Sequence, residues 1–304
     1  MFFGGGLDSS FGLAFVRKYF PEVKAISVAG IECKENIEVI KNTDNCEVVK
    51  LQYTQKEVIK KFGYPVVSKK TAKSIRRLQN PSEKNKKSRE LALTGITSTG
   101  NKASTYKLAN KWRFLIDSGI PISEKCCYYM KETVMHKYAK EKKLSMIVIT
   151  LAEESNERMK GYAKRGCNTF GELGYSTPFA FWTRQDILEW IVRERVTISK
   201  AYGEIKQDEE GKLKTTKAQR TGCPICMFGM ERDKTPNRFQ IMFYDDFKMW
   251  KRAMFELGYI EVLEYFIQHG FEKYQYLPQE LLKRIGEGEI SKEELIRDLR
   301  EGEQ

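Results

Sequence analysis

The sequence has no apolar run that approaches the roughly 18 residues a helix needs to span a bilayer. Its first residues, Met-Phe-Phe-Gly-Gly-Gly, also lack the basic stretch and apolar core of a secretory signal. We therefore expect a cytoplasmic protein with no membrane partner. Histidine is scarce too: the chain has His136 and His269, neither with a partner visible in the sequence, and we assign them no role.

Cysteine is present but is missing from the tail. The chain has seven cysteines, and none follows Cys226. Without an export signal, an odd count argues against a framework of disulfides. We expect reduced thiols, some of them serving as ligands.

Positive charge is in excess. The 304 residues include 53 Lys and Arg against 41 Asp and Glu, a formal net charge of +12. A hydrophobic content of 41% and an aromatic content of 12% are enough for a packed core and exclude wholesale disorder. The charge favours anionic partners such as nucleotides or nucleic acid, without choosing between them.

Predicted strands and helices alternate along most of the chain. Strands are expected at 25–28, just before Gly30, at 47–51 and at 145–150, the last a bounded run rich in β-branched residues. This alternation favours an α/β fold with a parallel sheet flanked by helices. Residues 241–304 show no strand pattern and are expected to form a helical C-terminal extension.

Two helix starts are predicted from capping-box spacing. Thr183 is followed by Asp186, and Ser291 by Glu294, each three residues on. The helix after Thr183 is expected to have one apolar face. That face consists of Ile187, Leu188, Ile191 and Val192.

The stretch 68–111 is strongly basic in its first half and rich in Gly, Ser and Thr in its second. We interpret it as a mobile insertion. It is either a solvated surface segment or a lid that grips the phosphates of a nucleotide or of a nucleic-acid backbone. Aromatic residues that could stack on bases are sparse there.

A glycine-rich turn lies between a short apolar stretch and a helical pattern. Its residues are Gly4, Gly5, Gly6, Leu7, Asp8, Ser9 and Ser10. Glycine backbone and a helix N-terminus together suit a phosphate. Asp8 can hold a Mg²⁺ that bridges phosphate oxygens, and the two serines add hydroxyl donors. The turn is neither a Walker A loop nor a Gly-x-Gly-x-x-Gly fingerprint; the alternative is a flexible glycine-rich start.

This segment resembles the Ser-Gly-Gly-x-Asp-Ser pyrophosphate loop (PP-loop) of the ATP pyrophosphatases, also called adenine nucleotide alpha hydrolases. Gly4 stands in place of the usual serine and Leu7 in place of a common lysine, whereas Asp8 and the serines are kept. The resemblance implies a Rossmann-like sheet that holds an adenine nucleotide, ATP with Mg²⁺, on the loop. Gly30 lies where relatives carry a Thr-Gly-x-Glu turn after the second strand.

The cysteines include two pairs. Cys126 and Cys127 are adjacent, and Cys223 and Cys226 form Cys-Pro-Ile-Cys. Two such pairs satisfy the four ligands of zinc or of a 4Fe–4S cluster. Adjacent thiolates suit separate iron corners better than one zinc, which favours iron–sulfur. Buried unligated cysteines and a redox-active dithiol are the alternatives.

The cysteine pattern resembles the cluster-binding set of the assimilatory sulfonucleotide reductases. The wider match is to the phosphoadenosine phosphosulfate (PAPS) reductase-like branch, which includes DndC-type proteins, and it covers most of residues 1–240, with the insertion at about 68–111. Its landmarks are 64–69, 125–127, 152–155 with Arg158, 166–168, 181–183, 220–223 and 236–240. The resemblance implies one adenine-nucleotide-binding domain followed by the helical extension.

Two departures favour an ATP-consuming enzyme over a reductase. The reductases use a cysteine in a C-terminal segment, but no cysteine follows Cys226, and Leu151 replaces an arginine common in relatives. Asp8, Ser9 and Ser10 also suit the β,γ-pyrophosphate of ATP, which an adenylylated sulfate lacks. We expect an ATP pyrophosphatase or sulfurtransferase that adenylates an acceptor and then delivers sulfur, with Asp8 and Ser9 as catalytic residues.

Further roles rest on single residues. Lys69, Arg158 and Arg220 are candidate phosphate clamps, or alternatively surface ion pairs. Cys167 is a spare thiol that could carry a persulfide, although a lone cysteine is more often packed. Candidate partners are a sulfur or electron donor protein and a nucleic-acid acceptor. The alternatives are a sulfonucleotide reductase using thioredoxin-type electrons and a non-catalytic nucleotide- or nucleic-acid-binding module.

Overall fold

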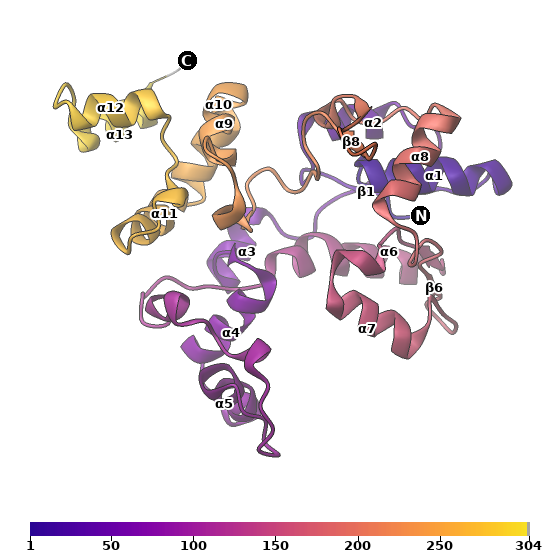
Figure 1. The fold of residues 1–304 in the computed structure, drawn as a ribbon, viewed down its shortest axis with the longest axis horizontal. Coiled ribbons are helices and arrows are strands. Elements are labelled where there is room, and N and C mark those ends of the chain that lie inside the picture. The colour runs from indigo at the N-terminus through magenta and orange to yellow at the C-terminus, as the bar shows by residue number, and fades with distance from the viewer. Residues whose placement is uncertain (303–304) are drawn as a thin grey trace. The chain divides into compact units, whose positions relative to one another are not determined.

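The computed structural model describes residues 1–302, which form two compact units. The first unit combines Met1–Gln52 with Met130–Pro224, and the second combines Tyr53–Tyr129 with the chain from Ile225 onward. Each unit is therefore assembled from segments far apart in the sequence (Figure 1). The expected boundary at residue 240 follows from a family resemblance rather than from compactness, and it stays a prediction.

The first unit mixes helices with short strands. Its helices are α1 (Leu7–Tyr19), α2 (Lys34–Lys41), α6 (Thr133–Glu141), α7 (Asn156–Arg165) and α8 (Arg184–Glu194). Its strands are β1 (Ala25–Val28), β2 (Cys46–Val49), β4 (Met146–Ile147), β5 (Asn168–Thr169), β6 (Tyr175–Ser176), β7 (Ile205–Gln207) and β8 (Leu213–Thr215). The unit is thus mixed α/β, as the alternating pattern predicts.

Backbone hydrogen bonds of the first three residues connect the small sheets of this unit. β1 pairs in parallel with β2, and β4 in parallel with β6, while β5 joins β6 in antiparallel fashion. The Phe3 N–H donates to the Ile26 carbonyl at 2.8 Å, and the Phe2 N–H donates to the Ile147 carbonyl at 3.0 Å. Residues 1–3 therefore lie between β1 and β4, which gives the order β2, β1, residues 1–3, β4, β6, β5.

The predicted strands form at the expected places, with different lengths. The strand at 25–28 is confirmed as β1, and the strand predicted at 47–51 forms one residue earlier as Cys46–Val49. The strand predicted at 145–150 is reduced to Met146–Ile147. An apolar run fixes where a strand lies, whereas its length depends on the partner, and β6 offers two residues.

The helix α8 begins as predicted. Thr183 accepts the Asp186 N–H in a complete capping box. Ile187, Leu188 and Ile191 are buried. Val192, the fourth residue of the apolar face, is 49% exposed, so the buried part of this face is one residue narrower than the apolar pattern.

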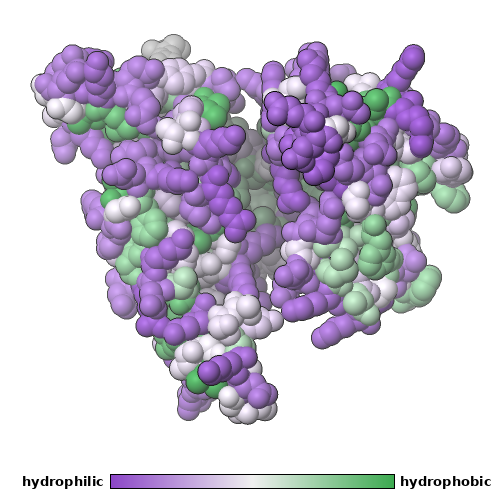
Figure 2. All heavy atoms as spheres, viewed as in Figure 1, coloured by the Kyte–Doolittle hydropathy of each residue, from purple (hydrophilic) through white to green (hydrophobic). Residues whose placement is uncertain are grey.

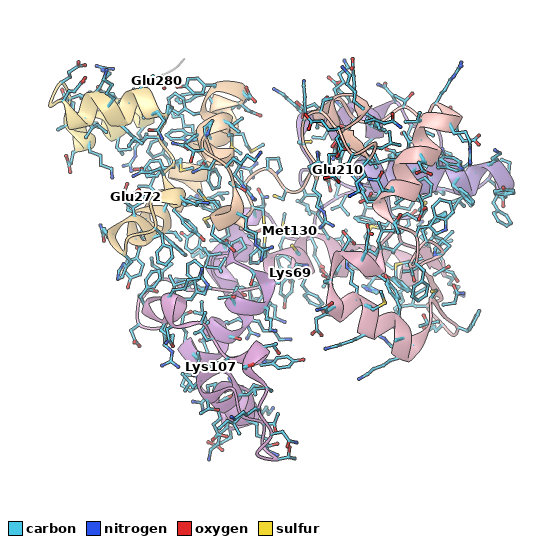
Figure 3. The ribbon with its side chains drawn as sticks, viewed as in Figure 1. Lys69, Lys107, Met130, Glu210, Glu272 and Glu280 are labelled. Atoms are coloured by element: carbon cyan, nitrogen blue, oxygen red, sulfur yellow. The ribbon has the colours of Figure 1, made fainter. Side chains whose placement is uncertain are left out.

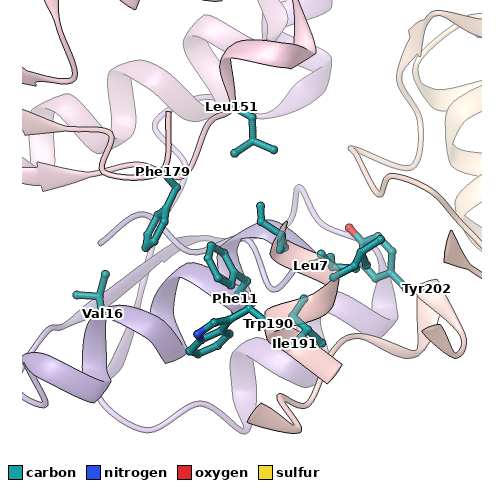
Figure 4. Packing of buried hydrophobic residues seen from close by; sticks show 10 residues of the cluster. Leu7, Phe11, Val16, Leu151, Phe179, Trp190, Ile191 and Tyr202 are labelled. Carbon is teal, nitrogen blue, oxygen red and sulfur yellow. The ribbon is translucent and has the colours of Figure 1, made fainter. Parts of the chain in front are cut away.

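The core of the first unit joins α8 to α1. Phe11 of α1 packs edge-on against Trp190 of α8, with ring centroids 5.2 Å apart, and Leu7 and Ile191 belong to the same cluster (Figure 4). Both Leu7 and Phe11 are fully buried. This packing fixes the first turn of α1, and with it the glycine turn that precedes the helix.

The second unit is mostly helical. Its helices are α3 (Gln55–Phe62), α4 (Lys69–Gln79), α5 (Lys86–Thr94), α9 (Arg238–Asp245), α10 (Phe247–Lys251), α11 (Tyr259–Gln268), α12 (Gln279–Gly286) and α13 (Lys292–Glu301). β3 (Val66–Val67) pairs in parallel with β9 (Met227–Phe228). Residues 241–302 contain no strand, and Ser291 caps α13 through the Glu294 N–H, so both predictions for the tail are confirmed.

The basic stretch 68–111 contains two helices, α4 and α5, which contact each other. Its first half is therefore folded, although its composition is that of a surface segment. The visible faces of both units are largely hydrophilic, with scattered hydrophobic residues (Figure 2). Among the helices of residues 1–302, none has the length and apolar character required to cross a membrane.

Candidate functional site

The glycine loop (residues 4–6) connects the first backbone segment to α1 and is tightly enclosed. Gly5 has a φ of +65°, and a Cβ there would lie 2.4 Å from the Asn36 carbonyl oxygen. A Cβ at Gly4 would approach Glu32 Oε1 at 3.3 Å, and one at Gly6 would approach Thr221 Oγ1 at 3.1 Å. Gly5 thus needs glycine for both its backbone conformation and its space.

The first turn of α1 carries the residues predicted to contact phosphate. Gly6 stands at the cap position, where it has no side chain to bind the first amides, so those amides can serve an anion. Asp8 is 35% exposed, and the Ser9 hydroxyl donates to the Gly6 carbonyl at 2.9 Å. Ser10 is 5% exposed and faces the interior, where its hydroxyl has no hydrogen-bond partner. Asp8 and Ser9 are therefore better placed than Ser10 to contact a ligand.

Asp8 forms an ion pair with Arg184, the first residue of α8. The same guanidinium donates to the Gln219 carbonyl at 3.0 Å, and the Arg184 backbone N–H donates to Glu153 at 2.7 Å. The sequence analysis missed Arg184. It directly follows Trp182-Thr183 of a quoted landmark, and no local pattern marks it.

Two further predicted residues converge on the same region. Glu154 pairs with Arg158 and also, at 2.9 Å, with Arg220. Burial lowers the pKa of Arg158, and the charge of Arg220 lowers it further, while the negative charge of Asp8 acts in the opposite direction. Arg158 and Arg220, predicted from separate segments, thus share the Glu154 carboxylate.

A buried polar network ties residues 220–223 to the glycine loop. The Asn36 amide donates to Thr221 Oγ1 at 3.0 Å, and that oxygen lies 2.8 Å from the Tyr202 hydroxyl. Asn36 is fully buried, and its Oδ1 has no hydrogen-bond partner. The sequence analysis missed Asn36 and Tyr202, because a buried polar side chain can be recognised only from its surroundings.

The turn after β1 supports the loop from the other side. Gly30 has a φ of +71°, the left-handed conformation that favours glycine. Two residues on, Glu32 is 8% exposed and accepts a hydrogen bond from Lys131 Nζ at 2.7 Å. Gly30 therefore shapes the turn that brings the buried Glu32 carboxylate next to Gly4.

These residues fit a magnesium polyphosphate. Three guanidinium groups pair with two carboxylates: Arg184 with Asp8 at the start of α1, and Arg158 and Arg220 with Glu154. Arginine forks suit phosphate oxygens, and a single carboxylate with phosphate oxygens is a common way to hold Mg²⁺. The unpartnered Asn36 Oδ1 is an additional acceptor beside the loop.

The cysteine pairs are divided between the units. Cys223 belongs to the first unit, whereas Cys126, Cys127 and Cys226 belong to the second. Burial raises the pKa of the Cys226 thiol and the nearby Cys127 raises it further, whereas the Phe228 N–H, Arg238 and Lys69 lower it in part. Cys127 and Cys226 are therefore neighbours.

The described residues do not assemble a metal centre. Within residues 1–302, no three His, Cys, Asp or Glu side chains are grouped so as to hold a metal ion. The iron–sulfur cluster, with zinc as its alternative, stays a prediction.

Lys69 and Arg238 flank Cys226. Lys69 is the first residue of α4, after the Ser68 cap (Figure 3), and belongs to the second unit. Arg238 donates to the Cys226 carbonyl at 2.8 Å and forms a two-point ion pair with Asp233. Just before Ser68, Val67 has a φ of +61°, a strained conformation for a β-branched residue. The segment leading into Lys69 is thus under backbone strain.

Cys167 lies in the first unit at the start of the β5–β6 hairpin. It is partly buried, and its carbonyl accepts the Thr177 N–H at 2.8 Å and the Thr177 hydroxyl at 2.9 Å. These bonds involve the backbone and leave the thiol available. Its persulfide role stays a prediction.

Comparison of the sequence with protein-family models and with curated proteins finds no match in either set. The resemblance to the PAPS reductase-like branch therefore stays a prediction, and the functional argument depends on the geometry above.

Proposed function

We propose that the first unit binds ATP on its glycine loop and transfers the adenylyl group to an acceptor with release of pyrophosphate. Sulfur delivery to the activated acceptor would follow, as in the PP-loop enzymes that the sequence resembles. The observation that carries the proposal is a pair of ion-pair sets linked through adjacent residues. Asp8 at the start of α1 pairs with Arg184, whose backbone N–H binds Glu153, and the next residue, Glu154, pairs with Arg158 and Arg220.

The strand order supports a Rossmann-like arrangement for this unit. From residues 1–3 the chain passes through α1 to β1 and later to β2 on one side, whereas β4 and β6 lie on the other side. Doubly wound sheets bind ligands where the strand order reverses, beyond the carboxyl end of the strand. The glycine loop follows residues 1–3 at that point in the order.

The adenylation step assigns a task to each residue. An acceptor oxygen attacks the α-phosphorus of ATP, the new O–P bond forms, and the bond to the bridging oxygen breaks so that pyrophosphate leaves. Glycine-loop amides and the arginine forks bind the departing charge, the electrostatic role that contributes most in such reactions. Asp8 would hold a bound Mg²⁺, and that ion would neutralise phosphate charge.

The step uses none of the cysteines. Cys167, and the pairs predicted to bind a cluster, are reserved for the later sulfur delivery, for which a donor protein is needed. The acceptor bears an oxygen nucleophile, and nucleic acid is one candidate.

Pyrophosphate release tests the proposal. Purified protein is incubated with ATP, Mg²⁺ and separate acceptor pools of small metabolites or total nucleic acid, with D8N as the inactive control. Release that depends on one pool and on Asp8 supports the proposal. No release with any pool, together with tight nucleic-acid binding, would favour the non-catalytic module instead.

A sulfonucleotide reductase is the second candidate. It would reduce an adenylylated sulfate with thioredoxin-type electrons, but the chain has no cysteine beyond Cys226 to act as its nucleophile. Sulfite production from an adenylylated sulfate, unaffected by D8N, would favour it.

A further inference from the structure

Arg184 holds the one carboxylate of the glycine-rich segment 4–10. Its guanidinium pairs with Asp8, and the two side chains are 25% and 35% exposed. The Gln219 carbonyl and the Glu153 carboxylate bind Arg184 at two further points. Asp8 is therefore engaged in this structure by a cation that the protein itself supplies.

The scaffold holds Arg184 firmly in this position. It follows the Thr183 capping box at the start of α8, and α8 is anchored in the core by Trp190 and Ile191. The pair is thus a standing feature of the site rather than a passing surface contact.

Arg184 and a divalent cation need the same carboxylate. A Mg²⁺ bound at Asp8 would face a guanidinium at close range unless that guanidinium moved. The phosphates of ATP offer the Arg184 guanidinium an alternative partner to Asp8, because guanidinium forks bind phosphate oxygens with two hydrogen bonds.

We propose that Arg184 guards Asp8 against metal ions until a polyphosphate arrives. The guanidinium then passes from Asp8 to the phosphate, and Mg²⁺ takes Asp8. The inference rests on the proposed ATP site and adds that metal and nucleotide bind cooperatively. The nucleotide draws Arg184 away from Asp8, which lets the metal bind Asp8, and a metal on Asp8 favours the position of Arg184 on the phosphates. Free metal alone binds weakly as a result.

Binding of Mn²⁺ without nucleotide tests this directly. The wild type is compared with R184Q, with D8N and with R193Q, a matched change on the same helix at an exposed arginine paired with Glu194. We expect R184Q to bind Mn²⁺ about tenfold more tightly, within the usual range of coupling between sites. R193Q should match the wild type, and D8N should lose the site. R184K keeps a positive charge but not the fork, and should stay close to the wild type in Mn²⁺ affinity.

The nucleotide supplies the second measurement. With a non-hydrolysable ATP analogue present, the wild type should bind Mn²⁺ more tightly than without it, and R184Q should lose most of this gain. Equal Mn²⁺ affinity in R184Q and wild type would overturn the proposal, as would the absence of Mn²⁺ binding in both. If R184Q does not fold, judged by its thermal unfolding, an equal Mn²⁺ affinity of the wild type with and without the analogue overturns it.

The Mn²⁺ result is independent of pyrophosphate release. If the proposed function fails and no pyrophosphate is released, the R184Q comparison still decides whether Arg184 guards Asp8.

Discussion

The two units differ in how their predicted site residues are placed. In the first unit, Asp8, Arg158 and Arg220 come from three segments and all form ion pairs, Asp8 with Arg184 and the two arginines with Glu154. In the second unit, Cys126, Cys127 and Cys226 share one compact unit, whereas Cys223, the fourth predicted ligand, belongs to the first unit; within residues 1–302 no group of three metal-ligating side chains is formed.

The difference follows from how each site is built. The glycine loop is a continuous segment whose shape is set by its own glycines and by the helix that follows. The cysteine set needs four thiols from two distant segments, and metal binding normally contributes much of the energy that gathers such ligands. A glycine loop is thus formed by the chain itself, whereas a cluster site is completed by its ligand.

The largest expected effect is on the stability of the first unit. Gly5→Ala adds a Cβ 2.4 Å from the Asn36 carbonyl at a φ of +65°, and should cost about 3–5 kcal/mol in the free energy of unfolding. Gly161→Ala in α7 is the matched control, because its Cβ meets Arg165 at 3.4 Å, an ordinary contact. Chemical denaturation measures both; a Gly5 variant as stable as the control would contradict the enclosed loop.

A comparably large effect is expected on catalysis. Asp8→Asn should lower adenylation by about 10²–10³-fold, the usual cost of removing one electrostatic contributor. Asp208→Asn, in the β7–β8 turn and paired with Lys214, should leave the rate unchanged. The measurement is the initial rate of pyrophosphate release. Similar rates in the two variants would contradict an active centre at Asp8 in the first unit.

Variants of the cysteines test whether the second unit contributes ligands to a metal cluster. After anaerobic purification, we expect iron and sulfide in the wild type and their loss in Cys127→Ser and Cys226→Ser. Cys33→Ser should retain them, because the predicted ligands do not include that residue. Metal analysis and the visible spectrum report the result. Zinc, or no metal, in the wild type would contradict the predicted iron–sulfur cluster.

The smallest effects concern two capping residues, one in each unit. Thr183→Ala and Ser291→Ala each remove a cap and should each cost about 1 kcal/mol. Only Thr183→Ala should also weaken the binding of metal and nucleotide at the site, because Thr183 positions Arg184. Equal changes in nucleotide affinity would show that the position of α8 is unimportant to the site.

The same cap has a defined pH dependence. Hydrogen bonds from the Thr183 backbone N–H and hydroxyl lower the pKa of Asp186. A lowered carboxyl pKa stabilises the folded state above the ordinary Asp value of about 3.9, and this stabilisation is lost as the pH falls through the lowered value. Asp186→Asn should therefore be less stable than wild type at neutral pH, and the difference should vanish in acid. A difference that persists at low pH would show that the cost comes from another contact.

Sequence reasoning succeeded where a few neighbouring residues carry the signal. The strand at 25–28, the caps at Thr183 and Ser291 and the strand-free tail are confirmed. The predicted mixed α/β fold is found, whereas the Rossmann-like sheet is a proposal that depends on the hydrogen bonds of residues 1–3.

It was incomplete where three-dimensional contacts decide. Ser10 matches the loop motif, and its side chain is buried in the structure. Arg184, Asn36 and Tyr202 reach the glycine loop from distant segments, and no spacing marks them. Lys69 is the last residue of the landmark 64–69 and belongs to the second unit; its role as a phosphate clamp stays a prediction.

The most direct test of the central claim compares two ligands on the glycine loop. Calorimetry measures the binding of magnesium α,β-methylene-ATP and of AMP to the wild type and to D8N. We predict that the wild type binds the triphosphate at least about tenfold more tightly, since charged hydrogen bonds to the outer phosphates contribute about 1.5–3 kcal/mol each, and that D8N loses most of this preference. Equal affinity for the two ligands in the wild type would contradict an ATP pyrophosphate site on the loop.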